Sequence, residues 1–183
     1  MPVPPEVIAK LQSLQRRLSD ELQEVSWSRI NALHLTIRFF GNVAGERLDE
    51  LQKAIQNICA SAAPFPVRAE QVGCFGERVI WVGVGGAWQR LREMESQIKQ
   101  ATIGFGDHEE AREFRPHLTI GRVKKWRAGR VSVADKLVGL AGAEFGGWTV
   151  DHLELMRSEL LPQGARYTCL ATIPLAGKLP AEE

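Results

Sequence analysis

The chain has 183 residues, a length that suits one domain or two small lobes sharing a core. Its composition, 44% hydrophobic and 25% charged, is typical of a soluble globular protein, and no apolar stretch of about 18 residues predicts a membrane span. The formal net charge of +1 argues neither for nor against a nucleic-acid partner, so electrostatic evidence must come from local clusters.

The first half of the chain predicts two amphipathic helices, a strand between them and a β-hairpin. Apolar residues recur every three or four positions over Pro4–Leu22 and Glu46–Ala62, which indicates helices with one buried face. Leu33–Phe40 alternates instead, which predicts a strand. The side chains expected to face the core from this strand are Leu33, Leu35, Ile37 and Phe39. The hairpin strands are Phe65–Cys74 and Val79–Val84.

The second half predicts more strand than helix. A helix begins near Ala87, and an alternating strand, His117–Val123, follows a polar loop. After a possible short helix over Val133–Leu140, the chain ends in a hairpin of Trp148–Arg157 and Arg166–Pro174. This order predicts an α+β fold of mostly antiparallel strands, in a single domain covering residues 1–183.

One tetrapeptide occurs twice, about half a chain apart. It is His34-Leu35-Thr36-Ile37 in the first copy and His117-Leu118-Thr119-Ile120 in the second. Each copy lies on a predicted strand beside a helix. Two pseudo-symmetric lobes with a cleft between them are the simplest interpretation.

Each His-x-Thr repeat would place an imidazole and a hydroxyl on one face of a strand, because residues i and i+2 point the same way. Across a cleft, the hydroxyls can donate hydrogen bonds to phosphate oxygens. One neutral histidine can take a proton from water while the other, protonated, gives one to the leaving oxygen. An unperturbed pKa near 6.5 supplies both forms at neutral pH. The repeat therefore predicts phosphate-ester chemistry with a bell-shaped pH–rate profile.

Two alternative roles for the histidines stay open. Both could be satisfied core residues in repeated strands. They could also be metal ligands joined by His108 or Glu109, although no His-x-His or His-Glu-x-x-His spacing supports such a site. The symmetry of the repeat does not say which histidine is the acid and which is the base.

The residues around both repeats resemble a known family over nearly the whole chain. The matching segments are Trp27, His34–Gly41, Phe114–Arg122, Ser158-Glu159-Leu160, Gly164, Tyr167 and Pro174-Leu175. On these residues the sequence resembles the 2H phosphoesterase superfamily. Within that superfamily it is similar to the RNA 2′,3′-cyclic phosphodiesterases, also called 2′-5′ RNA ligase-like proteins.

The resemblance implies hydrolysis of a terminal 2′,3′-cyclic phosphodiester of RNA to a 2′-phosphomonoester, without a cofactor or metal. It makes His34 the proton donor to the 3′ oxygen and His117 the proton acceptor from water, with Thr36 and Thr119 holding the phosphate. Two other activities stay open. One is reversible 2′-5′ RNA ligation, with a ribose 5′-hydroxyl in place of water, and the other is nucleotide or RNA binding without turnover.

Three further residues are candidate substrate contacts. Arg38 shares the predicted strand face of His34, and Tyr167 lies on the last strand, where it would line the cleft or pack. For Arg122 the resemblance favours a role in the site, but strict alternation from His117 places it on the opposite face. A bulge would be needed to bring Arg122 into the cleft.

Basic residues cluster around the second repeat with a tryptophan among them. Such a run can steer phosphates and stack a base, although most charge runs are solvated surfaces. The cluster is Arg112, Arg115, Lys124, Lys125, Trp126, Arg127 and Arg130. We expect Trp81, Trp88 and Trp148 in the core or at its rim, and no catalytic role for His108 or His152.

The start of the chain departs from the family pattern. Family members open with an apolar strand before a Leu-Pro that leads into the first helix, whereas this chain starts Met1-Pro2-Val3-Pro4-Pro5. We expect that strand to be absent. An exposed sheet edge or a lower stability would follow unless another segment fills the position.

Cysteine usage and the N-terminus indicate the compartment. Cys59, Cys74 and Cys169 are scattered and form no CxxC pair, which predicts reduced thiols rather than a disulfide framework or a metal site. The N-terminus has no basic region followed by an apolar run, so the sequence does not predict a secretion signal. We expect a cytoplasmic monomer without membrane contact, whose partner is RNA or an oligonucleotide ending in a 2′,3′-cyclic phosphate.

Overall fold

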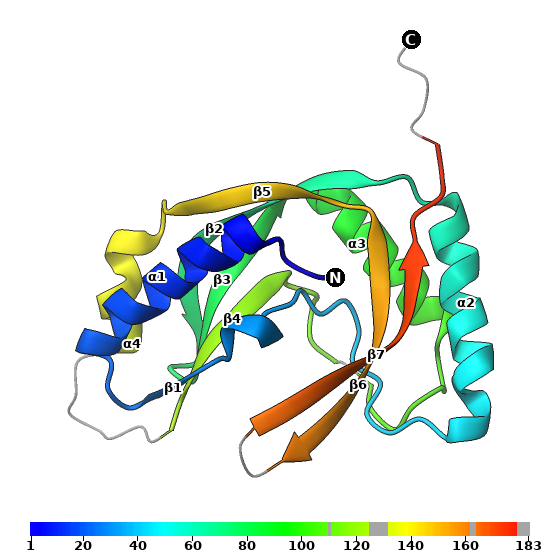
Figure 1. Cartoon of the computed structure of the whole chain (residues 1–183), viewed down its shortest axis with the longest axis horizontal. Helices are drawn as coiled ribbons and strands as arrows, with labels where there is room; N and C mark the ends of the chain where they lie inside the picture. Colours follow the sequence, from blue (N-terminus) through cyan, green and yellow to red (C-terminus); the bar gives the residue numbers. More distant parts are fainter. Residues whose placement is uncertain (110, 125–131, 162–163, 179–183) are drawn as a thin grey trace.

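Two antiparallel sheets organise the chain (Figure 1). The computed structural model describes residues 1–109, 111–124, 132–161 and 164–178. The larger sheet has the strand order β1-β4-β3-β2-β5, and the smaller sheet is the hairpin β6–β7. The elements are α1 (Pro5–Glu21), β1 (Val25–Trp27), η1 (Ile30–Ala32), η2 (Gly45–Arg47), α2 (Leu48–Ser61), β2 (Phe65–Phe75), β3 (Val79–Gly86), α3 (Trp88–Ala101), β4 (His117–Val123), α4 (Val133–Leu137), η3 (Val138–Leu140), β5 (Glu144–Val150), β6 (His152–Leu161) and β7 (Gly164–Pro174).

The longer helices form where the apolar spacing predicts them. α1 starts at Pro5, whose missing N–H costs nothing in a first turn. Its apolar stripe is buried, as are the stripes of α2 and α3. The buried side chains of these stripes are Val7, Leu11, Leu14, Leu18, Leu51, Ile55, Leu91, Met94 and Ile98. The predicted α+β class with mostly antiparallel strands is confirmed.

A polar side chain within the α1 stripe joins three elements. Gln15 is buried, and its Nε2 donates hydrogen bonds to the carbonyls of Ser28, at 3.0 Å, and Ile120, at 2.8 Å. The backbone N–H of Ser28 also donates to the Ile120 carbonyl at 2.9 Å. These bonds attach α1 and the end of β1 to the strand that carries the second repeat.

The strand predicted over Leu33–Phe40 does not form. This segment makes one antiparallel bridge, between Pro2 and His34. The N–H of Leu35 donates to the Met1 carbonyl, and the Met1 amine donates to the Leu35 carbonyl, each at 3.1 Å. Prolines at positions 2 and 4 have no N–H, so this ladder cannot lengthen. The first residues of the chain thus cover part of the edge that was expected to be exposed.

Two further strand predictions are wrong in detail. Phe39 is 54% exposed, with its ring against that of His108 at 5.2 Å, so it is not a core residue. The expected strand Trp148–Arg157 is two strands, because β5 ends at Val150 and pairs with β2, whereas β6 pairs with β7. Burial alternates on both sides of the break at Asp151, so the sequence pattern does not show it.

No helix in the described ranges has the length and apolar character needed to cross a membrane. The three cysteines are free thiols, with Cys59 buried and Cys169 exposed. Burial raises the pKa of the Cys59 thiol to about 11, so that thiol is inert at neutral pH.

Candidate active site

The two repeat histidines have matching main-chain contacts. The Nδ1 of His34 lies 2.7 Å from the carbonyl oxygen of Ala32, and the Nδ1 of His117 lies 2.6 Å from that of Arg115. A carbonyl oxygen only accepts hydrogen bonds, so Nδ1 carries the proton in both rings. In each ring, Nε2 is therefore the nitrogen that gains or loses a proton.

An aromatic ring lies edge-on against each imidazole. The centroid of Tyr167 on β7 is 4.9 Å from that of His34, at an interplanar angle of 71°. Phe75, the last residue of β2, lies 5.0 Å from His117 at 88°. Such T-shaped contacts hold a ring in place without occupying its nitrogens. One repeat is thus set against the smaller sheet through Tyr167, and the other belongs to the larger sheet.

The half-buried His34 has a perturbed pKa. Burial is the main cause and lowers the pKa of His34 below its ordinary value of 6.5. The hydrogen bond to the Ala32 carbonyl and the negative charge of Glu154 act against this shift by favouring the charged ring. The net effect is that the free protein favours the neutral form of His34 near pH 7.

A bulge in β4 brings Arg122 to the face of the second repeat. Thr119 pairs with Trp81, and Arg122 pairs with Val79, which lies two residues from Trp81 on β3. Cross-strand partners share a face, as do alternate residues of one strand, so Thr119 and Arg122 point to the same side. His117, two residues before Thr119, also lies on that side. Arg122 is exposed and satisfies the geometric condition that the sequence left open.

The repeat threonines have hydroxyls available for a ligand. Thr119 is half-buried on β4, and Thr36 is exposed two residues after His34. In the ranges that the structure describes, neither hydroxyl makes a hydrogen bond to the protein. A hydroxyl in that state can donate to a phosphate oxygen without breaking a protein contact.

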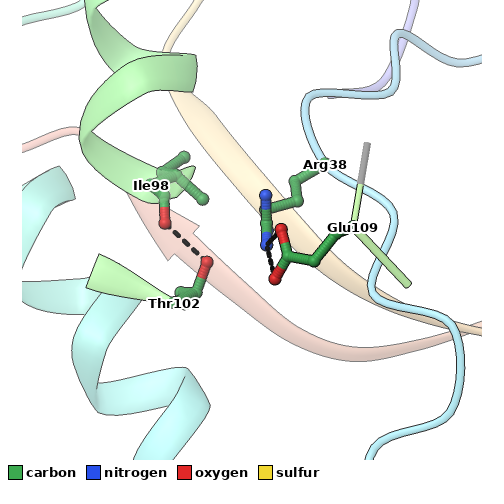
Figure 2. A network of polar contacts seen from close by, with 4 residues as sticks. All are labelled: Arg38, Ile98, Thr102 and Glu109. Carbon is green, nitrogen blue, oxygen red and sulfur yellow. Dashed lines mark hydrogen bonds and ion pairs between the residues drawn. The ribbon is translucent and has the colours of Figure 1, made fainter. Parts of the chain in front are cut away.

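Arg38 is buried in an ion pair rather than open to solvent (Figure 2). Its side chain is 4% exposed, and Nη2 lies 3.3 Å from both carboxylate oxygens of Glu109. Its Nε has no hydrogen-bond partner among the described residues. The Arg38 side chain, which was expected to share a face with His34, thus contacts Glu109 in the loop before the second repeat. A direct contact between Arg38 and the substrate stays a prediction.

Further contacts join the segment after the first repeat to the loop before the second. The N–H and the side-chain amide of Asn42 donate to the two carboxylate oxygens of Asp107, each at 2.7 Å. The N–H of His108 donates to the Phe40 carbonyl at 3.2 Å. We call residues 38–42 and 106–109 the clasp. It connects the flanks of the two repeats across 65 residues or more of sequence.

The other candidates lie apart or are only partly described. Arg112, Arg115 and Lys124 are exposed, whereas Lys125, Trp126, Arg127 and Arg130 fall outside the described residues. His152 pairs with Asp151 through Nδ1 at 2.5 Å. The described residues contain no group of three His, Cys, Asp or Glu side chains arranged as metal ligands.

Sequence reasoning did not identify Phe75 or Glu154 as neighbours of the histidines. Phe75 closes the first strand of the β2–β3 hairpin, and only the register of the hairpin places it beside His117. Glu154 belongs to the strand that was predicted to continue from Trp148, so its position near His34 was hidden by the undetected break. The alternation of residues 152–156 was the only available signal.

Comparisons with known proteins agree with the resemblance. A family model described as the 2′-5′ RNA ligase superfamily matches residues 3–160. An RNA 2′,3′-cyclic phosphodiesterase of Methanothermobacter thermautotrophicus is 30% identical over 160 residues, covering 83% of this chain and 85% of that protein. One from Methanocaldococcus jannaschii is 33% identical over 139 residues, covering 74% of this chain and 76% of that protein.

Solved structures share the fold. A crystal structure from Thermus thermophilus superposes with a TM-score of 0.78 at 24% identity, covering 97% of this chain and 96% of that one. E. coli LigT in its apo form gives a TM-score of 0.73 at 20% identity, covering 96% and 94%. Together with the match over residues 3–160, these findings show that the chain belongs to the 2′-5′ RNA ligase superfamily.

Proposed function

We propose that this chain hydrolyses the terminal 2′,3′-cyclic phosphodiester of RNA to a 2′-phosphomonoester. The observation that carries the proposal is the matched state of His34 and His117, each with Nδ1 bonded to the carbonyl two residues before it. Relatives that are 30% and 33% identical are named RNA 2′,3′-cyclic phosphodiesterase, which supports the same substrate class. The site would lie between the two lobes of a single domain.

The proposed reaction moves two protons. A water oxygen attacks phosphorus while Nε2 of His117 takes a proton from that water. The bond from phosphorus to the 3′ oxygen breaks, and Nε2 of His34 gives its proton to that oxygen. The products are a 2′-phosphate and a free 3′-hydroxyl, and proton exchange with solvent returns both rings to their starting forms. Thr36 and Thr119 donate to the non-bridging oxygens and stabilise the charge that they carry.

Because the pKa of His34 is lowered, the substrate itself is proposed to promote protonation of this proton donor. Burial keeps His34 neutral in the free protein, whereas a donor must be protonated. A phosphodiester anion beside the ring favours the charged imidazolium and raises the pKa. Binding of substrate would therefore recruit the proton that the reaction consumes. The side chains of Arg122 and Tyr167 are proposed to contact the substrate at the same site.

We also propose that the protein acts as a monomer in the cytoplasm on RNA. Both histidines and their aromatic neighbours come from one chain. Three free thiols suit a reducing compartment. Light scattering of the purified protein tests the monomer, and fractionation of the cells that produce it tests the compartment.

The decisive experiment identifies the product isomer from an RNA ending in a 2′,3′-cyclic phosphate, in excess EDTA. The expected result is a 2′-phosphate that disappears in His34→Ala and in His117→Ala, while the matched control His152→Ala remains active. No turnover by the folded parent protein would overturn the proposal. Activity lost only with EDTA would instead show the histidines to be metal ligands. Adding a 5′-hydroxyl RNA and observing a 2′-5′ linkage would show ligation.

A further inference from the structure

The outer half of the β6–β7 hairpin leaves the core of the protein. Leu153, Leu155 and Ile173 are buried at its base, but from Met156 to Leu161 every side chain is exposed or half-buried. Figure 1 shows this part of the hairpin extending away from the rest of the chain. A two-stranded ribbon that projects in this way gains little from the core, so its exposed side chains are available for a ligand.

The strand register shows which face of the hairpin turns toward His34. Tyr167 contacts the His34 ring, and its cross-strand partner is Ser158. Since partners and alternate residues share a face, the same face carries three residues of each strand. They are Met156, Ser158 and Leu160 on β6 and Ala165, Tyr167 and Cys169 on β7. We call these six residues the hairpin face.

The hairpin face contains no charged residue and exposes large apolar groups. Leu160 is 90% exposed, and Met156 and Tyr167 are each 38% exposed. The opposite face is charged, with Arg166 on β7 and Arg157 and Glu159 on β6; Nη2 of Arg166 lies 2.9 Å from Glu159. Leu161, at the end of β6 on the other face, is 40% exposed, but the hairpin face is the one that combines exposed apolar side chains with a contact to a reactive histidine, which favours a binding surface there.

In-line displacement fixes the direction in which the RNA leaves the site. The attacking water and the leaving 3′ oxygen stand on opposite sides of phosphorus. Under the proposed roles, water lies on the side of His117, so the 3′ oxygen and its ribose lie on the side of His34. The rest of the RNA continues from the 5′ oxygen of that same ribose. It therefore starts beside Tyr167, whose pair with Ser158 is the middle one of the hairpin face, and continues toward the outer pair of Leu160 and Ala165.

We propose that the hairpin face binds the RNA nucleotides on the 5′ side of the cyclic phosphate, by stacking and apolar contact with bases and riboses. This inference rests on the proposed function. From Ser158, the partner of Tyr167, to Leu160 the face extends over about 7 Å, at roughly 3.3 Å per residue. That length matches two stacked nucleotides at about 3.4 Å each. The absence of charge on the six residues predicts recognition of bases rather than phosphates.

The test compares two substrates, a 2′,3′-cyclic mononucleotide and a tetranucleotide ending in the same cyclic phosphate. The parent protein should have a lower KM for the tetranucleotide. Leu160→Ser should raise that KM about fivefold and leave the mononucleotide KM and both kcat values unchanged. Because Leu160 is 90% exposed, this substitution does not threaten folding. Val138→Ser, at an exposed apolar residue of η3, is the matched control and should alter neither substrate.

Equal KM values for the two lengths in the parent, or an equal effect of Leu160→Ser on both substrates, would overturn the inference. If the parent protein hydrolyses neither substrate, the proposed function is wrong. A binding measurement can then still test whether the hairpin face binds RNA. A fluorescein-labelled tetranucleotide with a 2′-phosphate end should bind the parent more tightly than Leu160→Ser in an anisotropy titration. The ratio of the two affinities should not change with salt, since no charge is altered. Equal affinities would overturn it.

Discussion

Asp107 accepts two hydrogen bonds from Asn42, one from the backbone N–H and one from the side-chain amide, each 2.7 Å long. The residue before Asn42, Gly41, has φ +70°, and a Cβ there would come within 2.0 Å of the Asp107 carboxylate. A turn of this shape needs glycine. The pair joins the end of the first repeat segment to the loop that leads into the second repeat, so we treat it as a positioning contact for the two histidines.

Replacing Asp107 with alanine is expected to lower kcat about tenfold with little change in KM, because a small displacement of one acid–base group weakens the reaction more than binding. Steady-state kinetics on a 2′,3′-cyclic mononucleotide measure this split. Glu50→Ala removes another exposed carboxylate that is paired, with Arg47, and should leave kcat unchanged. A change confined to KM, or the same loss in both variants, would show that Asp107 does not position the site.

The ion pair between Arg38 and Glu109 predicts an asymmetry in stability. Glu109→Gln leaves a buried guanidinium without its carboxylate, whereas Arg38→Met removes the buried charge and keeps much of the packing. We expect Glu109→Gln to cost about 2 kcal/mol of unfolding free energy and Arg38→Met less. Urea denaturation compares them, and the double variant should resemble Arg38→Met. A larger loss in Arg38→Met would contradict the reasoning.

The pH dependence should differ between free and substrate-bound protein. An NMR titration follows the proton of His34 directly, whereas a bell-shaped rate profile reports both histidines together. Burial lowers the pKa of His34 in the free protein, so its titration midpoint should lie below 6.5. A bound phosphate anion raises that pKa, so the midpoint should lie at higher pH in the complex with a 2′-phosphate product. Coincident midpoints in the free and bound protein would argue against His34 as the donor that the substrate loads.

Removing the ring that covers His34 should raise its pKa. The main cause of the lowered value is burial, and Tyr167 supplies part of it from 4.9 Å. In Tyr167→Ala the imidazole becomes more hydrated, so its NMR titration midpoint should move up toward 6.5. Tyr167→Phe keeps the ring and should keep the midpoint. An unchanged midpoint in the alanine variant would show that other groups bury His34.

The elements that could be predicted from the sequence are those whose pattern is local. The stripes of α1, α2 and α3 and the alternation of β4 each extend over enough residues to be recognised. The three residues of β1 are too few to alternate. The strand predicted through Asp151 failed because the inward-facing pattern continues while the pairing partner changes from β2 to β7.

The face of the strand on which each side chain lies was the hardest feature of the site to predict. Counting alternate residues from His117 puts Arg122 on the wrong face, and only the bulge around Ile120 corrects the count. Counting alternate residues places Phe39 on the buried face, but its ring is exposed. Its segment makes a single β-bridge, so no ladder of hydrogen bonds holds the side chain toward the core. Contacts between distant segments, such as Phe75 with His117, depend on hairpin register, which no local pattern reports.

The Nδ1 contacts of the two histidines have a consequence for protein engineering. Their acceptors are main-chain oxygens at positions 32 and 115. The choice of ring nitrogen that carries the proton therefore does not depend on the side chains at these two positions. Ala32 and Arg115 can be exchanged in a library without changing the tautomer of either imidazole. A single-residue insertion between 115 and 117 would separate the ring from its acceptor. Tolerance at these two positions should therefore be high for substitutions and very low for insertions or deletions.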